Sequence, residues 1–202
     1  MQVHELYGDA LRLIKDSRIK EGMKLLDKAL IIDDKDVEVL NLMGLCNYIY
    51  CNFKRARYYF EKSSKLEKKN KATQYMLTMY SREFYSIYDK YRCSLVLIDN
   101  RKYSNAINMV EELKVLNKEL ITPYEILYLL YRNIGKEDLA FENIEMAYIL
   151  DKSNEDIARY YNEELKERLK EKEEKLERAF YLYLSAIIIF FTLIILWILL
   201  LV

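Results

Sequence analysis

The sequence has very little glycine and proline, with four Gly and one Pro in 202 residues. These residues form most tight turns and β-bulges, so their scarcity argues against a many-stranded sheet. It favours long helices joined by short loops. We therefore expect an all-α protein, with about 178 residues ahead of a C-terminal apolar run, enough for one domain with its own core.

Residues with reactive or metal-binding side chains are also scarce. His4 is the only histidine, and no Cys, Asp or Glu cluster accompanies it. Cys46, Cys51 and Cys93 are odd in number and lack metal-type spacing, as expected for reduced thiols in a core. No two glycines lie within ten residues of each other, so there is no glycine-rich phosphate loop. We predict a protein that is not an enzyme, with no cofactor and no metal.

Net charge is absent, because 32 basic residues balance 32 acidic ones. A chain without a net field is not expected to attract nucleic acid or to bind anionic lipid over a broad surface. We therefore predict no nucleic-acid partner, and charge alone does not identify another.

The segment 179–202 contains no charged residue. At about 1.5 Å per residue it would extend roughly 36 Å, more than the hydrocarbon core of a bilayer. Tyr181, Tyr183 and Trp197 stand near its ends, where an aromatic belt is expected. We predict a single transmembrane helix in contact with membrane lipid; the alternative, a buried core helix, needs an apolar surface all round it.

The charges beside this segment predict its orientation. The N-terminal residues 1–20 alternate charged and apolar residues and do not resemble a signal peptide. Seven Lys and Arg lie between Arg159 and Arg178, and none follows the span. The positive-inside rule then predicts a single-pass tail anchor with the N-terminal domain in the cytoplasm.

A spacing of 34 residues relates residues 3–36 to 37–70, and residues 87–120 to 121–154. Large apolar residues fall on large ones and small residues on small ones. Examples are Leu6 and Leu40, Ala10 and Gly44, Ala106 and Ala140. Such a period indicates stacked helical repeats.

This pattern resembles the tetratricopeptide repeat (TPR), a 34-residue helix-turn-helix unit, most closely in 40–70 and 124–154. In that family a small residue in the first helix lets the second helix approach, as Gly44 does here, whereas Tyr128 departs from the pattern. Gly135 matches the turn glycine, and the closing proline is absent. The resemblance implies a TPR-like helix-turn-helix solenoid of about four repeats over residues 3–154.

The two pairs of repeats are out of phase. Ala56 and Ala106 are 50 residues apart, which is one period of 34 plus 16. The excess predicts an extra central helix over 71–86. Because no Gly or Pro follows it, this helix either continues to Ile98 as one long helix or ends before a separate one.

The segment 155–178 is highly charged and is predicted to be one helix. Ser153 or Asn154 caps its start, and its first apolar residues cover the end of the repeat stack. Further on it becomes a charged stalk; a dimeric coiled coil is the alternative, although the heptad pattern fails within three heptads. The expected organisation is thus a repeat domain (3–154), a capping helix and stalk (155–178) and a transmembrane helix (179–202).

The TPR resemblance implies that ligands bind the concave face lined by first helices. Tyr and Arg on such a surface are typical of binding hot spots. The matching positions here that we expect to bind a partner are Tyr7, Leu11, Asn41, Leu45, Tyr48, Tyr88, Tyr91, Arg92, Leu95 and Arg132. Glu125 and Leu129 match the same face.

The expected ligand is a protein or peptide with an apolar or amphipathic segment. The Lys and Asn set with which some TPR domains clamp a carboxylate is not supported, because Tyr7, Leu11 and Leu42 stand in most of its places. The sequence predicts a membrane-anchored adaptor or scaffold. The alternative is a structural or assembly subunit of a membrane protein complex, recruited through its transmembrane helix.

Overall fold

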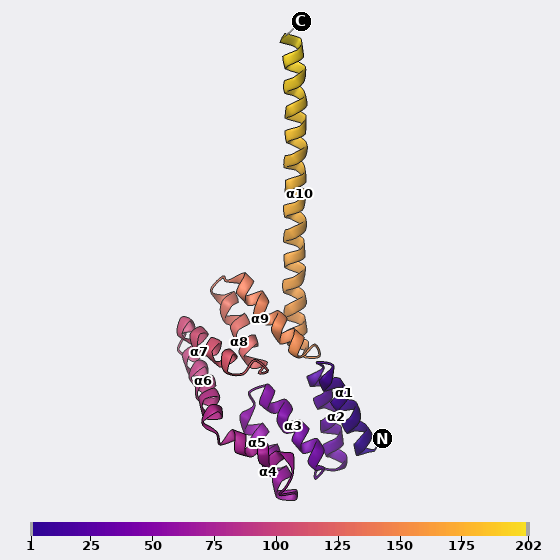
Figure 1. The fold of residues 1–202 in the computed structure, drawn as a ribbon, viewed down its shortest axis with the longest axis vertical. Helices are drawn as coiled ribbons and strands as arrows, with labels where there is room; N and C mark the ends of the chain where they lie inside the picture. Colours follow the sequence, from indigo (N-terminus) through magenta and orange to yellow (C-terminus); the bar gives the residue numbers. More distant parts are fainter. Residues whose placement is uncertain (1, 201–202) are drawn as a thin grey trace. The chain divides into compact units, whose positions relative to one another are not determined.

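The computed structural model describes residues 2–200, with side chains to residue 194, and this part of the chain contains ten α-helices and no strand (Figure 1). Two compact units are present, Met1–Tyr161 and Asn162–Val202. The helices are α1 (Val3–Lys15), α2 (Ile19–Ile32), α3 (Val37–Ile49), α4 (Phe53–Leu66), α5 (Lys71–Met79), α6 (Arg82–Asp99), α7 (Tyr103–Leu116), α8 (Thr122–Asn133), α9 (Glu137–Leu150) and α10 (Glu155–Leu200).

Most helices are arranged as antiparallel pairs: α1 packs with α2, α3 with α4, α6 with α7, and α8 with α9. The bounds follow the 34-residue period, because α1 and α2 begin at 3 and 19 and α3 and α4 at 37 and 53. Likewise α7 and α9 begin at 103 and 137 and end at 116 and 150. The predicted all-α fold of paired, TPR-like helices is confirmed.

The turn inside each pair also repeats. Ser17, Cys51, Arg101 and Gly135, at equivalent positions, all have φ between 54° and 70°. The next residue donates its N–H to the carbonyl five residues back, as from Arg18 to Leu13. This is a Schellman-type end to the first helix. Only glycine adopts that φ without strain, so the other three turns each cost about 1 kcal/mol.

The centre of the chain contains two helices, α5 and α6, separated at Tyr80 and Ser81. The Ser81 hydroxyl accepts a hydrogen bond from the N–H of Phe84 at 3.2 Å and begins α6. The continuous helix to Ile98 does not form, and the extra helix ends at Met79 rather than near residue 86. A serine cap is enough to separate the two helices without any Gly or Pro.

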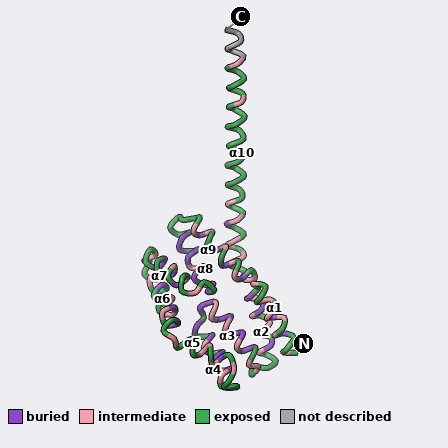
Figure 2. Tube along the Cα trace, viewed as in Figure 1, coloured by how far each residue is buried: buried purple, intermediate pink, exposed green. Residues whose placement is uncertain are grey.

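The buried residues of the first unit form two clusters, and Figure 2 shows them along both helices of each pair. The larger cluster contains residues of α1, α2, α3, α7, α8 and α9, together with Ile157 of α10. The smaller one lies around α4, α5 and α6 and contains Phe53, Phe60, Met79 and Phe84. The first and last repeats therefore share one core.

The cysteines are only partly where the sequence suggested. Cys46 and Cys51 are buried, and burial raises the pKa of each thiol to about 12. Cys93 is exposed on α6, so the prediction that it lies in the core is wrong.

The start of α10 belongs to the first unit. Asn154 Oδ1 accepts hydrogen bonds from the N–H groups of Asp156 and Ile157, so this residue is the predicted cap. Ile157 is buried, and the ring of Tyr161 stacks on that of Tyr148 at 4.4 Å. The first two turns of α10 thus cover the last helix pair, as capping helices do.

The second unit is the rest of α10, a single continuous helix. Its polar part carries ion pairs four residues apart, Glu171 with Lys175 at 3.8 Å and Glu174 with Arg178 at 3.5 Å. Its apolar part is exposed, with Phe180 60% and Leu182 71% accessible. Within the described residues α10 is the one helix long and apolar enough to cross a membrane. The Trp197 side chain, expected in the aromatic belt, lies outside the described residues.

The close approach of α3 and α4 at Gly44 gives a stability test. A Cβ on Gly44 would lie 2.4 Å from the ring of Phe60, which is fully buried. We expect Gly44→Ala to lower the free energy of unfolding by about 1–2 kcal/mol, because overpacking outweighs the gain in helix propensity. Gly8, within α1, has nothing within 4 Å. Gly8→Ala should therefore raise the free energy of unfolding by about 0.5–1 kcal/mol. Urea unfolding of both variants measures these changes in stability. Equal changes in the two variants would contradict the close contact at Gly44.

Candidate functional site

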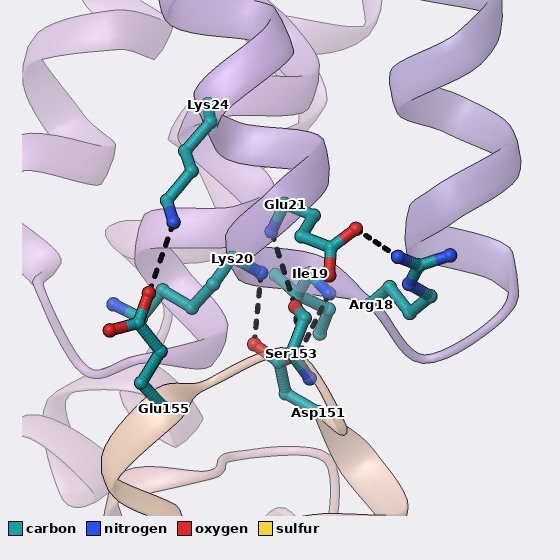
Figure 3. Close-up of polar contacts among 8 residues, drawn as sticks. All are labelled: Arg18, Ile19, Lys20, Glu21, Lys24, Asp151, Ser153 and Glu155. Carbon is teal, nitrogen blue, oxygen red and sulfur yellow. Dashed lines mark hydrogen bonds and ion pairs between the residues drawn. The ribbon is translucent and has the colours of Figure 1, made fainter. Parts of the chain in front are cut away.

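The N-terminus of α2 is held by a loop from the far end of the repeat array. Arg18, the N-cap residue of α2, provides no side-chain cap. Instead Asp151 accepts hydrogen bonds from the N–H groups of Ile19 and Lys20, both at 2.9 Å, as Figure 3 shows. Ser153 Oγ accepts a hydrogen bond from the next N–H group of α2, that of Glu21, at 3.1 Å. A carboxylate at this place also complements the helix dipole.

Asp151 has further partners that anchor its carboxylate. It is fully buried, and it accepts hydrogen bonds from the Ser153 N–H and hydroxyl and from the Tyr50 hydroxyl at the end of α3. Burial beside this carboxylate raises the pKa of Tyr50, so its hydroxyl stays a donor. The N–H of Lys152 donates to the Ser17 carbonyl at 2.7 Å. The first two repeats are thereby joined to the end of the last one.

A second loop reaches the same region. The N–H of Ile121, before α8, donates to the carbonyl of Ile49 at 2.9 Å. The Thr122 hydroxyl donates to the carbonyl of Tyr50 at the same distance. These bonds satisfy carbonyl groups that the end of α3 would otherwise leave without partners. The loops before α8 and α10 thus both close on the turns of the first two pairs.

One charged side chain of α8 lies beside this junction. Burial raises the pKa of Glu125 to about 7; Lys20 opposes the shift, while Asp156 and Asp151 add to it. Lys20 Nζ lies 3.9 Å from the centre of the Tyr50 ring. Glu125 therefore titrates in the neutral range.

The predicted partner-binding residues fall into separate groups. Tyr7, Leu11, Asn41 and Leu45 line one groove between α1, α3 and α5, with a volume of about 380 Å³, which we call the N-terminal groove. Tyr75 and Asn70 also line it. Leu45 also lines an adjoining pocket of about 300 Å³ together with Tyr48.

The N-terminal groove contains a polar atom with no internal partner. Asn41 Oδ1 is buried, and no group in the described part of the chain donates a hydrogen bond to it. A buried carbonyl oxygen without a donor costs about 1–3 kcal/mol. Because this oxygen is not accessible to solvent, a ligand N–H group reaches it only after the Asn41 side chain turns toward the groove. The groove also has apolar walls, from Tyr7, Leu11 and Leu45, and charged residues along its edge, among them Glu38 and Lys71.

Tyr88, Tyr91 and Arg92 line a different pocket, of about 540 Å³, between the start of α4 and α6. We call it the arginine pocket, because Arg55 and Arg57 of α4 also line it. Those two residues were absent from the expected set. They lie on a second helix, which the assignment of binding to first helices leaves out.

The remaining two predicted residues line none of these three pockets. Leu95 is 38% exposed on α6, and Arg132 is exposed on α8. The structure thus groups eight of the ten positions and leaves these two apart. No group of three or more His, Cys, Asp or Glu within the described residues could hold a metal ion.

No family model and no curated protein matches the chain. Among solved structures it is similar to MamA, a TPR protein. MamA 41-end from Desulfovibrio magneticus RS-1 aligns at TM-score 0.38 and 18% identity, covering 84% of this chain and 87% of that one. A structure of MamA AMB-1 aligns at TM-score 0.39 and 16% identity, and the alignment covers 85% of each chain. With TM-scores below 0.4, these alignments do not bear on partners. The fold assignment rests on the helix pairs themselves.

The junction at Asp151 predicts a large loss of stability when its carboxylate is removed. Asp151→Ala leaves the N–H groups of Ile19 and Lys20 without acceptors in a buried place. We expect the free energy of unfolding to fall by roughly 3 kcal/mol or more. Asp33, which ends α2 at the equivalent position, is exposed, and its carboxylate accepts a hydrogen bond from the N–H of Lys35, two residues further along the chain. Asp33→Ala should cost under about 1 kcal/mol. Chemical unfolding compares the two, and similar losses would mean that the junction does not hold the repeats.

Glu125 predicts a pH-dependent stability. In the unfolded chain its carboxyl titrates near 4.5, and in the folded chain near 7. Between these values the folded state holds a proton that the unfolded state has lost, so the free energy of unfolding falls as pH rises through this range. The loss is at most about 3 kcal/mol.

Glu125→Gln removes this titration and tests the assignment. The variant should be about 1–3 kcal/mol more stable than the wild-type chain at about pH 8, and similar to it at about pH 5. Urea unfolding at both pH values provides the measurement. A difference that is the same at both would contradict the shifted pKa.

Proposed function

We propose that this protein is a membrane-anchored scaffold that binds a segment of a partner protein on the inner surface of its helical repeats. The observation that carries the proposal is the N-terminal groove. Tyr7, Leu11 and Leu45 provide apolar contact area there, and Asn41 Oδ1 offers an unused acceptor. An extended or helical segment with apolar side chains and a free N–H group would match the apolar walls and the Asn41 oxygen.

The apolar part of α10 supports the anchoring half of this proposal. Its side chains, from Phe180 to the end of the described side chains, are almost all exposed. Such a continuous apolar surface is stable in lipid and aggregates in water. We propose that residues 179–202 cross the bilayer once, with the repeat domain and the Lys- and Arg-containing segment 159–178 on the cytoplasmic side. A tether of this kind raises the concentration of the bound partner near the membrane.

The alternative function is that of a structural subunit, recruited by its transmembrane helix. Ser185 and Thr192 carry small hydroxyls in the apolar part of α10, and each donates its hydroxyl hydrogen to a carbonyl of its own helix. Each hydroxyl thus uses its one hydrogen within its own helix, and only its oxygen remains to accept a bond from a neighbouring helix in lipid. The scaffold role is therefore favoured.

Asn41→Leu tests the groove. The substitution removes the unsatisfied oxygen, so the fold should be equally or more stable, while a ligand loses its acceptor. In quantitative affinity purification of the full chain from detergent, we expect specific partners to be captured roughly threefold to tenfold less. Asn105→Leu, at an exposed site on α7, is the matched control and should leave capture unchanged.

Undiminished capture by Asn41→Leu would show that the groove is not the binding surface. The same purification separates the two functions when residues 179–202 are replaced by an unrelated membrane span. A scaffold keeps its partners after this exchange, whereas a subunit recruited through its own span loses them. Release of the wild-type chain from membranes by alkaline washing would disprove the anchor.

A further inference from the structure

The arginine pocket exists because α5 interrupts the regular stacking of pairs. α5 packs along the later part of α4, where the rings of Phe60 and Tyr75 lie 5.0 Å apart. The first turn of α4 faces α6 instead. The Phe53 ring meets those of Phe84 at 5.2 Å and Tyr91 at 5.7 Å, both edge to face. These aromatic rings form the apolar floor of the pocket.

The rim of the pocket carries charge of one sign. Lys54, Arg55, Arg57 and Arg92 line it, and no acidic residue does. In a chain with equal numbers of acidic and basic residues, four cations around one pocket of about 540 Å³ are a local excess. The pocket is therefore complementary to an anionic ligand.

The four rim cations differ from other basic residues in their lack of ion pairs. Other basic residues form ion pairs, such as Lys62 with Asp34 and Lys90 with Glu112. Within the described residues, none of the four rim cations has an acidic group within 4 Å. Arg55 lies near Asp27 of α2; partial burial raises the pKa of that carboxyl, and the charge of Arg55 lowers it.

Two guanidinium groups are oriented without being neutralised. Arg57 lies over the ring of Tyr80, 5.5 Å from its centre, and Arg92 over that of Tyr88 at 5.7 Å. Stacking on an aromatic face restrains the planar group and leaves its N–H donors free. A carboxylate then binds with little further loss of side-chain freedom.

We propose that the arginine pocket binds an acidic segment of a partner protein, with an aromatic or large aliphatic side chain placed on the Phe53–Phe84–Tyr91 floor. This inference rests on the proposed scaffold function and specifies its ligand. A single pocket with an aromatic floor suits one anchoring side chain flanked by carboxylates. It lacks the continuous basic track that a nucleic-acid strand requires.

The proposal is tested with labelled peptides and the full chain in a neutral detergent. The probe is a peptide in which glutamates flank one phenylalanine, and fluorescence anisotropy reports binding. A peptide with glutamine for each glutamate should bind at least about tenfold more weakly, as should one with alanine for the phenylalanine. Added salt should weaken binding of the acidic peptide more than binding of the glutamine peptide, because its charges interact with the cations at the rim.

The double variant Arg57→Gln, Arg92→Gln should lower affinity for the acidic peptide about tenfold or more. The matched control, Lys28→Gln with Lys136→Gln, removes the same charge from exposed sites outside the pocket and should lower it less than about twofold. The urea midpoint of each variant shows whether the fold is intact. Equal losses in both variants, or equal binding of the acidic and glutamine peptides, would overturn the proposal.

Other outcomes identify other occupants and would equally overturn it. Anionic phospholipid vesicles that bind the wild-type chain but not Arg57→Gln, Arg92→Gln, with no peptide bound, would indicate a lipid headgroup. Concentration-dependent dimerisation lost in the same variant would indicate a second copy. If partner capture depends on Asn41 but not on Arg57 and Arg92, the scaffold function stands and only the acidic ligand is wrong.

Discussion

The Asp151 carboxylate holds the first and last repeats of this protein together. It is fully buried, and it caps α2, a helix that has no cap of its own and begins 132 residues earlier. In an open solenoid each repeat contacts only its neighbours, so the ends are free to spread or twist. Here two loops close on the turns of the first pairs, and a single core contains residues from both ends. The first and last pairs are therefore joined by hydrogen bonds and by shared apolar contacts.

Within this closed array, the short helix α5 leaves room for the arginine pocket, which we propose as the site of an acidic segment. A regular stack would cover all of α4 with the next first helix. Because α5 has only nine residues, it leaves the start of α4 to α6, and the two helices meet through aromatic rings. Arg57 and Arg92 come from different repeats and converge there. An irregularity in the repeat thus concentrates charge that is balanced over the chain as a whole.

Much of the fold was predictable from periodicity. The 34-residue offset and the small residue at Gly44 determine which faces pack, and α1 to α4 follow them closely. Eight of the ten expected binding residues line the three pockets, while Leu95 and Arg132 do not; that these residues bind a partner stays a prediction. The sequence left open whether 71–98 forms one helix or two and did not locate the break at Ser81, because a hydroxyl that caps the start of α6 leaves the apolar pattern unchanged.

By itself the sequence determined the local elements: paired helices, an inserted central helix, and a long helix that ends in an apolar run. These follow from spacing along the chain, since a helix places residues three and four apart on one face. Only the tertiary structure decided that Asp151 caps α2 and that the cations of α4 meet those of α6. Both depend on how residues distant in sequence approach one another, and one buried carboxylate or one short helix changes that approach without altering the local pattern.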